Sequence, residues 1–318
     1  MSFLYLTEAD VEQVLDMPLA IELVEEAFRR LAAGEAHNVP RVRARAPGVV
    51  LHSMSAAAEY LGRVGWKQYS TTRQGARFYV GLHDSTDGNL LAVIEANRLG
   101  QMRTGAATGL AIKLLADPQA VSLGLFGAGW QAQSQLAATA AVRPLQRALV
   151  FSPNAKHCRA FVARMTQQYP FEIGMVEKPR DAASGLPLVI AATTSRVPVF
   201  DGAWLAPGAL VCAIGSNWAE KMEIDIETIR AAERIVCDSV ECCRQEAGDL
   251  IAAADKGAFH WSQAMELCDV AAGKLPGRIS ADGIVLFKSV GMAIEDVAVA
   301  GRVFDLAQER GLGREVPG

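Results

Sequence analysis

The segment from residue 121 to residue 132 limits the possible folds of this chain more than any other. It reads VSLGLFGAGWQA: a short apolar strand, a Gly-x-Gly-x-x-Ala turn, and the start of a stretch that predicts a helix over residues 131–142. Gly127 permits a tight turn, and Gly129 lacks the Cβ that would keep the backbone away from a pyrophosphate. The helix N-terminus then offers free N–H groups to phosphate. A purely structural glycine turn has the same pattern, but the flanking strand and helix favour a dinucleotide site.

From residue 121 onward, short apolar segments alternate with helical ones. This rhythm predicts a parallel, doubly wound sheet of the Rossmann type, which we assign to residues 118–289. Further strands are expected over residues 147–151, 172–176, 188–192, 210–214 and 234–237, and helices over residues 155–168, 219–233 and 241–255.

The first 117 residues lack this rhythm and predict a separate α+β domain. A helical pattern with a break at Pro18 comes first, and an irregular or strand-like stretch interrupted by Pro40 and Pro47 follows it. Strands are then expected over residues 64–69, 78–84 and 90–95, and a helix over residues 103–115. The final segment is expected to turn from strand to helix at Ser289. Its apolar stripe needs a core to pack against, so we assign residues 290–318 to this first domain.

Composition and charge exclude several classes of protein. Of 318 residues, 51% are hydrophobic and 21% are charged, as in an ordinary soluble globular protein. The net charge of −4 without a long basic run argues against nucleic-acid binding. No apolar run reaches the roughly 18 residues of a membrane span, and the first residues lack a signal-peptide layout. The six cysteines form no Cys-x-x-Cys pair, so we expect reduced thiols in a cytoplasmic protein and no metal site.

The end of the second strand of the predicted sheet bears on the choice of cofactor. A site that prefers NAD usually places a carboxylate there, about 20 residues past the glycines. Here the strand ends in Ser152-Pro-Asn154, and Lys156 and Arg159 follow. Because this segment contains no carboxylate that would repel a 2′-phosphate, we favour NADP over NAD. The alternative is that the two cations are ordinary solvated charges on a helix.

Basic residues in the first domain are candidates for binding an anion. Arg103 and Thr104 lie where a helix is expected to begin, so the guanidinium could bind a carboxylate and Thr104 could cap the helix or contact a phosphate. Lys67 stands inside an apolar strand, where a buried amine would need an anionic partner. Arg41 alternates with Arg43 and Arg45, so the three share one face of an extended segment. Solvent-exposed charge is the simpler interpretation of each residue taken alone.

Polar residues follow the strand that ends at Ile214. Ligands of doubly wound sheets bind beyond the carboxyl ends of the strands, which places Ser216 and Asp225 near a bound cofactor. Asp225 could act as an acid or base there. It fits equally well as the N-cap of a helix over residues 226–233.

Taken together, these segments resemble the ornithine cyclodeaminase/mu-crystallin family along nearly the whole chain. The resemblance is carried by eight segments in order: Val-Pro-Arg41, Gly-Trp-Lys67, Asp-Gly-Asn-Leu-Leu-Ala, Arg103-Thr104-Gly-Ala-Ala-Thr, Gly127-Ala-Gly-Trp-Gln131-Ala, Ala-Thr193-Thr194-Ser, Ile-Gly-Ser-Asn…Glu-Ile-Asp225 and Phe-Lys-Ser289-Val-Gly-Met-Ala-Ile-Glu-Asp. Eight ordered segments are far more specific than one glycine turn.

The resemblance implies a role for each matching position. Arg41, Lys67 and Arg103 would hold the substrate, with Lys67 also contributing to catalysis, and Asp225 would be the catalytic acid or base. Val290 would lie on the substrate side. The cofactor would contact Thr104, Gly127, Ala128, Gly129, Gln131, Ser152, Asn154, Thr193, Thr194, Ser216 and Ser289. The family fold further implies a homodimer joined through the first domain.

The resemblance also implies a reaction, the NAD(P)H-dependent reduction of small cyclic 2-imino acids such as Δ1-pyrroline-2-carboxylate or Δ1-piperideine-2-carboxylate. Ornithine cyclodeamination and alanine dehydrogenation are alternatives, and a mu-crystallin-like protein that only binds cofactor and ligand is another. Ornithine cyclodeaminases carry a glutamate near the position of His52, suited to a second amino group. This chain has no carboxylate there, which disfavours a diamino acid.

Overall fold

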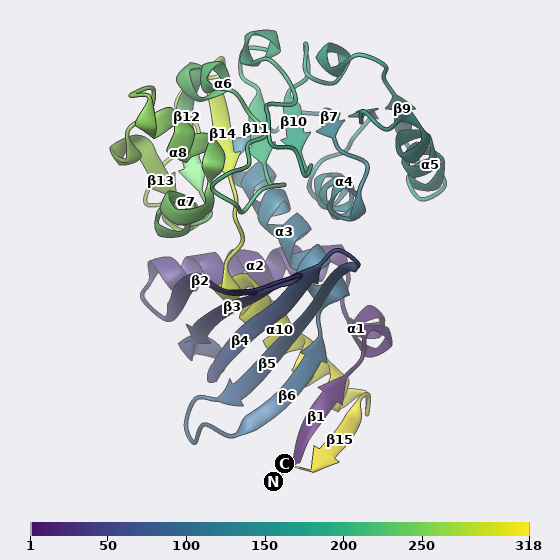
Figure 1. Ribbon diagram of the computed structural model, residues 1–318, viewed down its shortest axis with the longest axis vertical. Coiled ribbons are helices and arrows are strands. Elements are labelled where there is room, and N and C mark those ends of the chain that lie inside the picture. Colours follow the sequence, from purple (N-terminus) through teal and green to yellow (C-terminus); the bar gives the residue numbers. More distant parts are fainter. Residues whose placement is uncertain (1, 318) are drawn as a thin grey trace. The chain divides into compact units, whose positions relative to one another are not determined.

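The computed structural model describes residues 2–317 and divides into two compact units. Unit 1 contains the residues up to Ala106 and those from Met292 onward, and unit 2 runs from Ala107 to Gly291 (Figure 1). The helix α3, Asn97–Leu115, continues across the boundary between them. The sequence-based division put the boundaries at residues 117 and 290. No helix among the described residues combines the length and apolar character needed to cross a membrane.

Unit 2 is a doubly wound α/β unit, as the sequence rhythm predicts. Its eight strands are all parallel in the order β13-β12-β14-β11-β10-β7-β8-β9 (Figure 1). The strands are β7 Ser122–Phe126, β8 Arg147–Phe151, β9 Glu172–Met175, β10 Leu188–Ala191, β11 Leu210–Ala213, β12 Ala232–Cys237, β13 Ala264–Glu266 and β14 Ile284–Lys288. The helices are α4 Trp130–Val142, α5 Ala155–Thr166, α6 Ile226–Ala231, α7 Val240–Glu246, α8 Gly248–Asp255 and α9 Leu267–Ala271.

The central strands of unit 2 explain why this sheet forms where it does. β10 and β11 read Leu-Val-Ile-Ala and Leu-Val-Cys-Ala, and every residue in both strands is buried. Continuous apolar strands of this kind need helices on both faces, which parallel connections supply. The carboxyl ends of these strands therefore gather at one edge of a rigid, dry core.

Unit 1 is built on a seven-stranded sheet in the order β15-β1-β6-β5-β4-β3-β2. Neighbouring strands are antiparallel except for the β1–β6 pair. The strands are β1 Ser2–Leu6, β2 Ala36–Ala46, β3 Val49–Ala58, β4 Arg63–Thr72, β5 Gly75–Asp84, β6 Leu90–Glu95 and β15 Arg314–Pro317. The helices α1 Glu8–Val14, α2 Met17–Ala32 and α10 Ala293–Glu309 lie in this unit together with the first part of α3, and α10 packs on β2 to β5 (Figure 1).

Pro40 does not break the chain as expected. β2 continues through it, and the pairing with β3 shifts register between Val39 and Val42. Because β2 is the edge strand of the sheet, the missing N–H of proline costs no ladder hydrogen bond in the interior. Pro18 lies in the first turn of α2, where proline is tolerated, and the two predicted helices separate just before it.

The helix that carries Arg103 and Thr104 begins earlier than expected, at Asn97. Its start is capped from another element, because the Glu8 carboxylate accepts the backbone N–H groups of Asn97 at 2.7 Å and Arg98 at 2.8 Å. A cap supplied from a distant helix leaves no local signal. Arg103 therefore lies within the helix. Thr104 does not cap it, since its hydroxyl donates to the carbonyl oxygen of Gly100 at 2.7 Å.

Three other predicted elements need correction. The helix expected over residues 219–233 is confined to α6, because the chain enters strand β12 at Ala232. The helix expected over residues 241–255 divides into α7 and α8 at Ala247. The last helix begins at Ala293, four residues after Ser289. The strands β1 and β15, which pair with each other, were not predicted.

Candidate active site

The glycine turn of unit 2 is shaped to receive a ligand. Gly127 has a φ of 107°, and a Cβ there would clash with the carbonyl oxygen of Ala192, so only glycine fits. Gly129 is the N-cap of α4 and provides no side-chain cap. Among the described residues, no heavy atom lies within 4 Å of the Cβ that a larger residue would place at Gly129. The uncapped helix start and the open space beside it fit a pyrophosphate.

The remaining predicted cofactor residues of unit 2 are found at the same edge of the sheet. Ala128 and Gln131 belong to the glycine turn and the first turn of α4, and the Gln131 side chain accepts from the Ser134 hydroxyl at 3.0 Å. The others follow the carboxyl ends of parallel strands, namely Ser152 and Asn154 after β8, Thr193 and Thr194 after β10, Ser216 after β11 and Ser289 after β14. Parallel strands end at one edge, where ligands of doubly wound sheets bind.

The strand end that bears on cofactor choice is polar and free of carboxylates from Ser152 to Arg159. Asn154 caps α5, because its Oδ1 accepts the backbone N–H of His157 at 3.0 Å. Lys156 and Arg159 lie on the first turns of α5 and are exposed. Both cations are thus open to solvent and to a ligand.

Glu223 is a residue that the sequence analysis did not single out. Its Oε1 accepts the backbone N–H of Thr193 at 2.6 Å and the Thr193 hydroxyl at 2.7 Å, and its Oε2 accepts the N–H of Gly215 at 2.5 Å. Burial raises the pKa of Glu223 to about 7, although the nearby Lys288 ammonium opposes this change. One carboxylate thereby joins the segments that follow β10 and β11. Its position two residues before Asp225 was the available signal.

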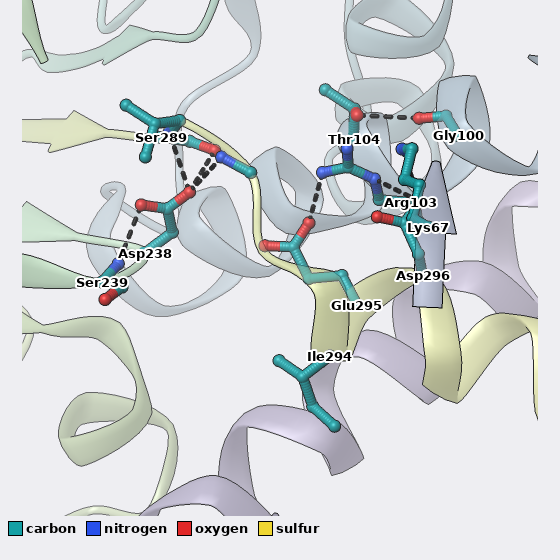
Figure 2. Close-up of polar contacts among 12 residues, drawn as sticks. Lys67, Gly100, Arg103, Thr104, Asp238, Ser239, Ser289, Ile294, Glu295 and Asp296 are labelled. Carbon is teal, nitrogen blue, oxygen red and sulfur yellow. Dashed lines mark hydrogen bonds and ion pairs between the residues drawn. The ribbon is translucent and has the colours of Figure 1, made fainter. Parts of the chain in front are cut away.

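Asp238, at the end of β12, was also missed. Its Oδ2 accepts the Ser289 hydroxyl at 2.8 Å and the backbone N–H groups of Val290 at 2.8 Å and Gly291 at 2.6 Å (Figure 2). The chain turns at Gly291, where φ is 81°. Asp238 therefore fixes the segment that contains the predicted cofactor residue Ser289 and the predicted substrate-side residue Val290.

Asp225 acts as the N-cap of α6. Its Oδ1 accepts the Thr228 backbone N–H at 2.8 Å and the Thr228 hydroxyl at 2.7 Å, and its Oδ2 accepts the N–H of Gly202 at 3.0 Å. Both carboxylate oxygens are therefore engaged, as the capping interpretation of this residue requires. Its role in proton transfer stays a prediction.

In unit 1, Lys67 and Arg103 share one carboxylate. Asp296 Oδ1 lies 2.7 Å from Lys67 Nζ and 3.0 Å from Arg103 Nε, and Glu295 Oε2 lies 2.7 Å from a terminal nitrogen of Arg103 (Figure 2). Lys67 is 2% exposed and both acids are completely buried. Lys67 comes from β4, Arg103 from α3 and the two acids from the first turn of α10. The paired charges hold both basic side chains in fixed positions.

The surroundings of Lys67 weaken its hold on a proton. Burial and the charges of Arg103 and Arg41 lower the pKa of Lys67, Asp296 opposes them, and the resulting pKa is about 8. Arg41 is 6% exposed and belongs to β2. Its effect on Lys67 places all three predicted substrate-binding cations within electrostatic range of one another. Such a cluster can bind a carboxylate and polarise a neighbouring polar group.

His52 is a neutral imidazole in this cluster. Burial lowers its pKa to about 4, and the guanidinium groups of Arg43, Arg41 and Arg45 add to the effect. The ring stacks on Tyr69 with a centroid separation of 4.1 Å. The Arg43 Nε donates to its Nδ1 at 3.2 Å. The three alternating arginines of β2 thus all act on the same imidazole, as expected if they share one face of the strand.

Among residues 2–317, no group of three or more His, Cys, Asp and Glu side chains could hold a metal ion. The fold and the two sets of residues define the class of protein. One unit has the glycine turn and strand-end edge of a dinucleotide-binding protein, and the other has a buried cationic cluster suited to an acidic small molecule.

Comparison with known proteins identifies the family. Residues 2–311 match the model of the ornithine cyclodeaminase/mu-crystallin family. A Δ1-pyrroline-2-carboxylate/Δ1-piperideine-2-carboxylate reductase of Azospirillum brasilense is 32% identical over 314 residues, which cover 96% of each chain. The structure of the Thermococcus litoralis Δ1-pyrroline-2-carboxylate reductase with NADH and L-proline superimposes with a TM-score of 0.95, at 34% identity over 99% of this chain and all of the other.

An archaeal alanine dehydrogenase dimer with bound NAD superimposes with a TM-score of 0.94. It is 30% identical, and the match covers all of this chain and 99% of the other. The chain therefore belongs to the ornithine cyclodeaminase/mu-crystallin family, as its eight sequence segments indicate.

Proposed function

We propose that this chain reduces small cyclic 2-imino acids, with Δ1-pyrroline-2-carboxylate and Δ1-piperideine-2-carboxylate as favoured substrates. The chain is an NAD(P)-dependent oxidoreductase acting on carbon–nitrogen bonds, in keeping with its family and its relatives. The observation that carries the acidic character of the substrate is the buried Lys67–Asp296–Arg103 arrangement with Arg41 in range, and the choice of cyclic imino acids follows the relatives. The arrangement offers cations to one carboxylate, while His52 offers no negative charge to a second amino group.

The proposed mechanism divides the work among a few residues. Arg41, Lys67 and Arg103 bind the substrate carboxylate and orient the C=N carbon. When bound, the nicotinamide supplies the hydride. We assign to Asp225 the transfer of the proton that the imine nitrogen receives. For an open-chain keto acid, the Lys67 ammonium would stabilise negative charge on the carbonyl oxygen.

We propose NADP as the preferred cofactor, with NAD as the alternative. The glycine turn would hold the pyrophosphate, and Ser152 and Asn154 would lie beside the adenosine ribose. The absence of a carboxylate between Ser152 and Arg159, together with exposed Lys156 and Arg159, favours a 2′-phosphate.

We also propose a homodimer joined through unit 1. On β3, His52, Met54 and Ala56 are buried, whereas Leu51, which points to the opposite face of the sheet, is 42% exposed. Three further exposed apolar residues lie on β2 and β4: Val39 (43%), Val42 (64%) and Val64 (40%). A second copy would cover this apolar face. The six cysteines are free and buried, which fits the reducing cytoplasm that we propose as its compartment.

The experiment follows the absorbance of NADPH and NADH at about 340 nm with the purified protein. The substrates are Δ1-pyrroline-2-carboxylate, Δ1-piperideine-2-carboxylate, and pyruvate with ammonia. Cofactor oxidation by the cyclic imino acids is expected to be fastest. Faster turnover of pyruvate with ammonia would identify an alanine dehydrogenase, and release of ammonia from ornithine would identify a cyclodeaminase. Cofactor binding with no turnover of any of them would identify a mu-crystallin-like binding protein.

A further inference from the structure

Unit 2 contains a buried set of charges that the proposed mechanism does not use. Lys288, the last residue of β14, lies 2.7 Å from Asp249 Oδ2 of α8, and both side chains are completely buried. Asp249 Oδ1 accepts the backbone N–H groups of Glu223 at 2.5 Å and Ile224 at 3.1 Å. The salt bridge therefore fixes the backbone of Glu223, whose side chain reaches the strand ends.

Glu223 connects two segments that touch each other. A Cβ at Gly215 would clash with the backbone of Thr193, so the segments after β10 and β11 have no space between them for a larger group. The carboxylate accepts two backbone N–H groups and one hydroxyl from these segments. The Thr193 hydroxyl in turn accepts the N–H of Ser195 at 3.1 Å, which extends the ordering along the loop.

We propose that Glu223 is a positioning residue for the cofactor, and that its ionised form is the one that holds the strand-end segments ready for binding. This inference rests on the proposed function, because it requires the nicotinamide cofactor to contact the segments of Thr193 and Ser216. A proton on the carboxyl group would face N–H donors and replace an accepted hydrogen bond with a donor-to-donor approach. The segments would then lose a shared anchor, and the cofactor would bind less tightly.

The electrostatics place this change in an accessible pH range. Burial raises the pKa of Glu223 to about 7, the Asp249 carboxylate adds to the increase, and the Lys288 ammonium and the hydrogen bonds from Thr193 oppose it. Lys288 approaches from β14 and Asp249 from α8. If only the ionised form is competent to bind, the dissociation constant at pH 6 is about tenfold higher than at pH 8.

The test measures the dissociation constant of NADH by fluorescence over about three pH units, from about pH 5.5 to about pH 8.5, around the expected midpoint of the Glu223 titration. The wild type is expected to show the tenfold step. Glu223→Gln is expected to bind NADH weakly and without the pH step. Its side chain cannot ionise, and its amide NH2 group would face a backbone N–H donor. Asp249→Asn retains an acceptor oxygen but removes a negative charge, so the midpoint is expected to move to lower pH. Glu227→Gln, an exposed acid on α6, is the matched control and should behave as wild type.

The outcomes separate this inference from the proposed function. A wild-type protein that binds neither NADH nor NADPH at any pH refutes the proposed function. Binding without a pH step, or a step that persists in Glu223→Gln, overturns the role of Glu223. If Glu223→Gln fails to fold by circular dichroism, the wild-type step and the direction of the Asp249→Asn shift decide.

Discussion

Replacing Lys67 with methionine should stabilise the protein and abolish its turnover. Lys67 is 2% exposed and forms an ion pair with Asp296, which also holds Arg103. Methionine has a similar length and no charge to bury. The substitution removes one proposed carboxylate ligand while Asp296 keeps its contact with Arg103.

The expected gain follows from the pKa of Lys67, which burial lowers from 10.5 to about 8. Below pH 8 the lysine is charged in both the folded and unfolded states, and the folded state bears the full cost of burying the charge. Between pH 8 and pH 10.5 only the unfolded state binds the proton, so wild-type stability rises with pH. The difference corresponds to about 3 kcal/mol at pH 7 and falls below about 1 kcal/mol near pH 10.

The assay is urea unfolding followed by circular dichroism at two pH values. One is about pH 7, below the Lys67 midpoint, and the other is about pH 10, above it. Lys113→Met, which changes an exposed lysine on α3, is the matched control and should stay within about 0.5 kcal/mol of wild type. A Lys67→Met protein less stable than wild type at pH 7 would show that the pairing with Asp296 outweighs the cost of burial. An unchanged kcat/KM in Lys67→Met would show that Lys67 does not bind the substrate carboxylate.

Three further predictions concern unit 2. Gly129→Val should leave the fold intact, because nothing lies within 4 Å of its Cβ, yet weaken NADPH binding at least about 100-fold. An unchanged dissociation constant by fluorescence titration would move the pyrophosphate elsewhere. Ser152→Asp should shift the ratio of kcat/KM for NADPH and NADH about tenfold toward NADH, and an unaltered ratio would contradict the assignment of the ribose site. Asp225→Asn should keep the cap of α6 through its Oδ1, lower the melting temperature because its amide NH2 faces the N–H of Gly202, and lower kcat at least about 100-fold. Full activity in that variant would leave Asp225 with the capping role alone.

The parts of the fold that could be predicted are those with local causes. The glycine turn can be recognised because strand, turn and helix are contiguous in the sequence. The apolar strands β10 and β11 predict a buried parallel sheet. The start of α3 could not be predicted, because Glu8 caps it from about 90 residues away. β1 and β15 stabilise each other across the length of the chain, so neither has a strong signal of its own.

The candidate site shows the same division. Lys67 and Arg103 could be singled out as basic residues in apolar surroundings. Their partner Asp296 is 229 residues away from Lys67 and lies on a helix that reads as ordinary core. Asp238 and Glu223 resemble solvent-facing acids in the sequence, and only the folded sheet turns them toward the strand-end segments. A charged residue that anchors backbone has no fixed spacing from the groups it anchors, so pattern alone does not find it.

Transfer of deuterium from NADPH labelled on the reactive face of its nicotinamide C4 tests the proposed reaction most directly. After incubation with Δ1-pyrroline-2-carboxylate, mass spectrometry should find proline with one deuterium on the α-carbon. Unlabelled proline, or no proline while the labelled cofactor remains reduced, would contradict hydride delivery to the C=N carbon.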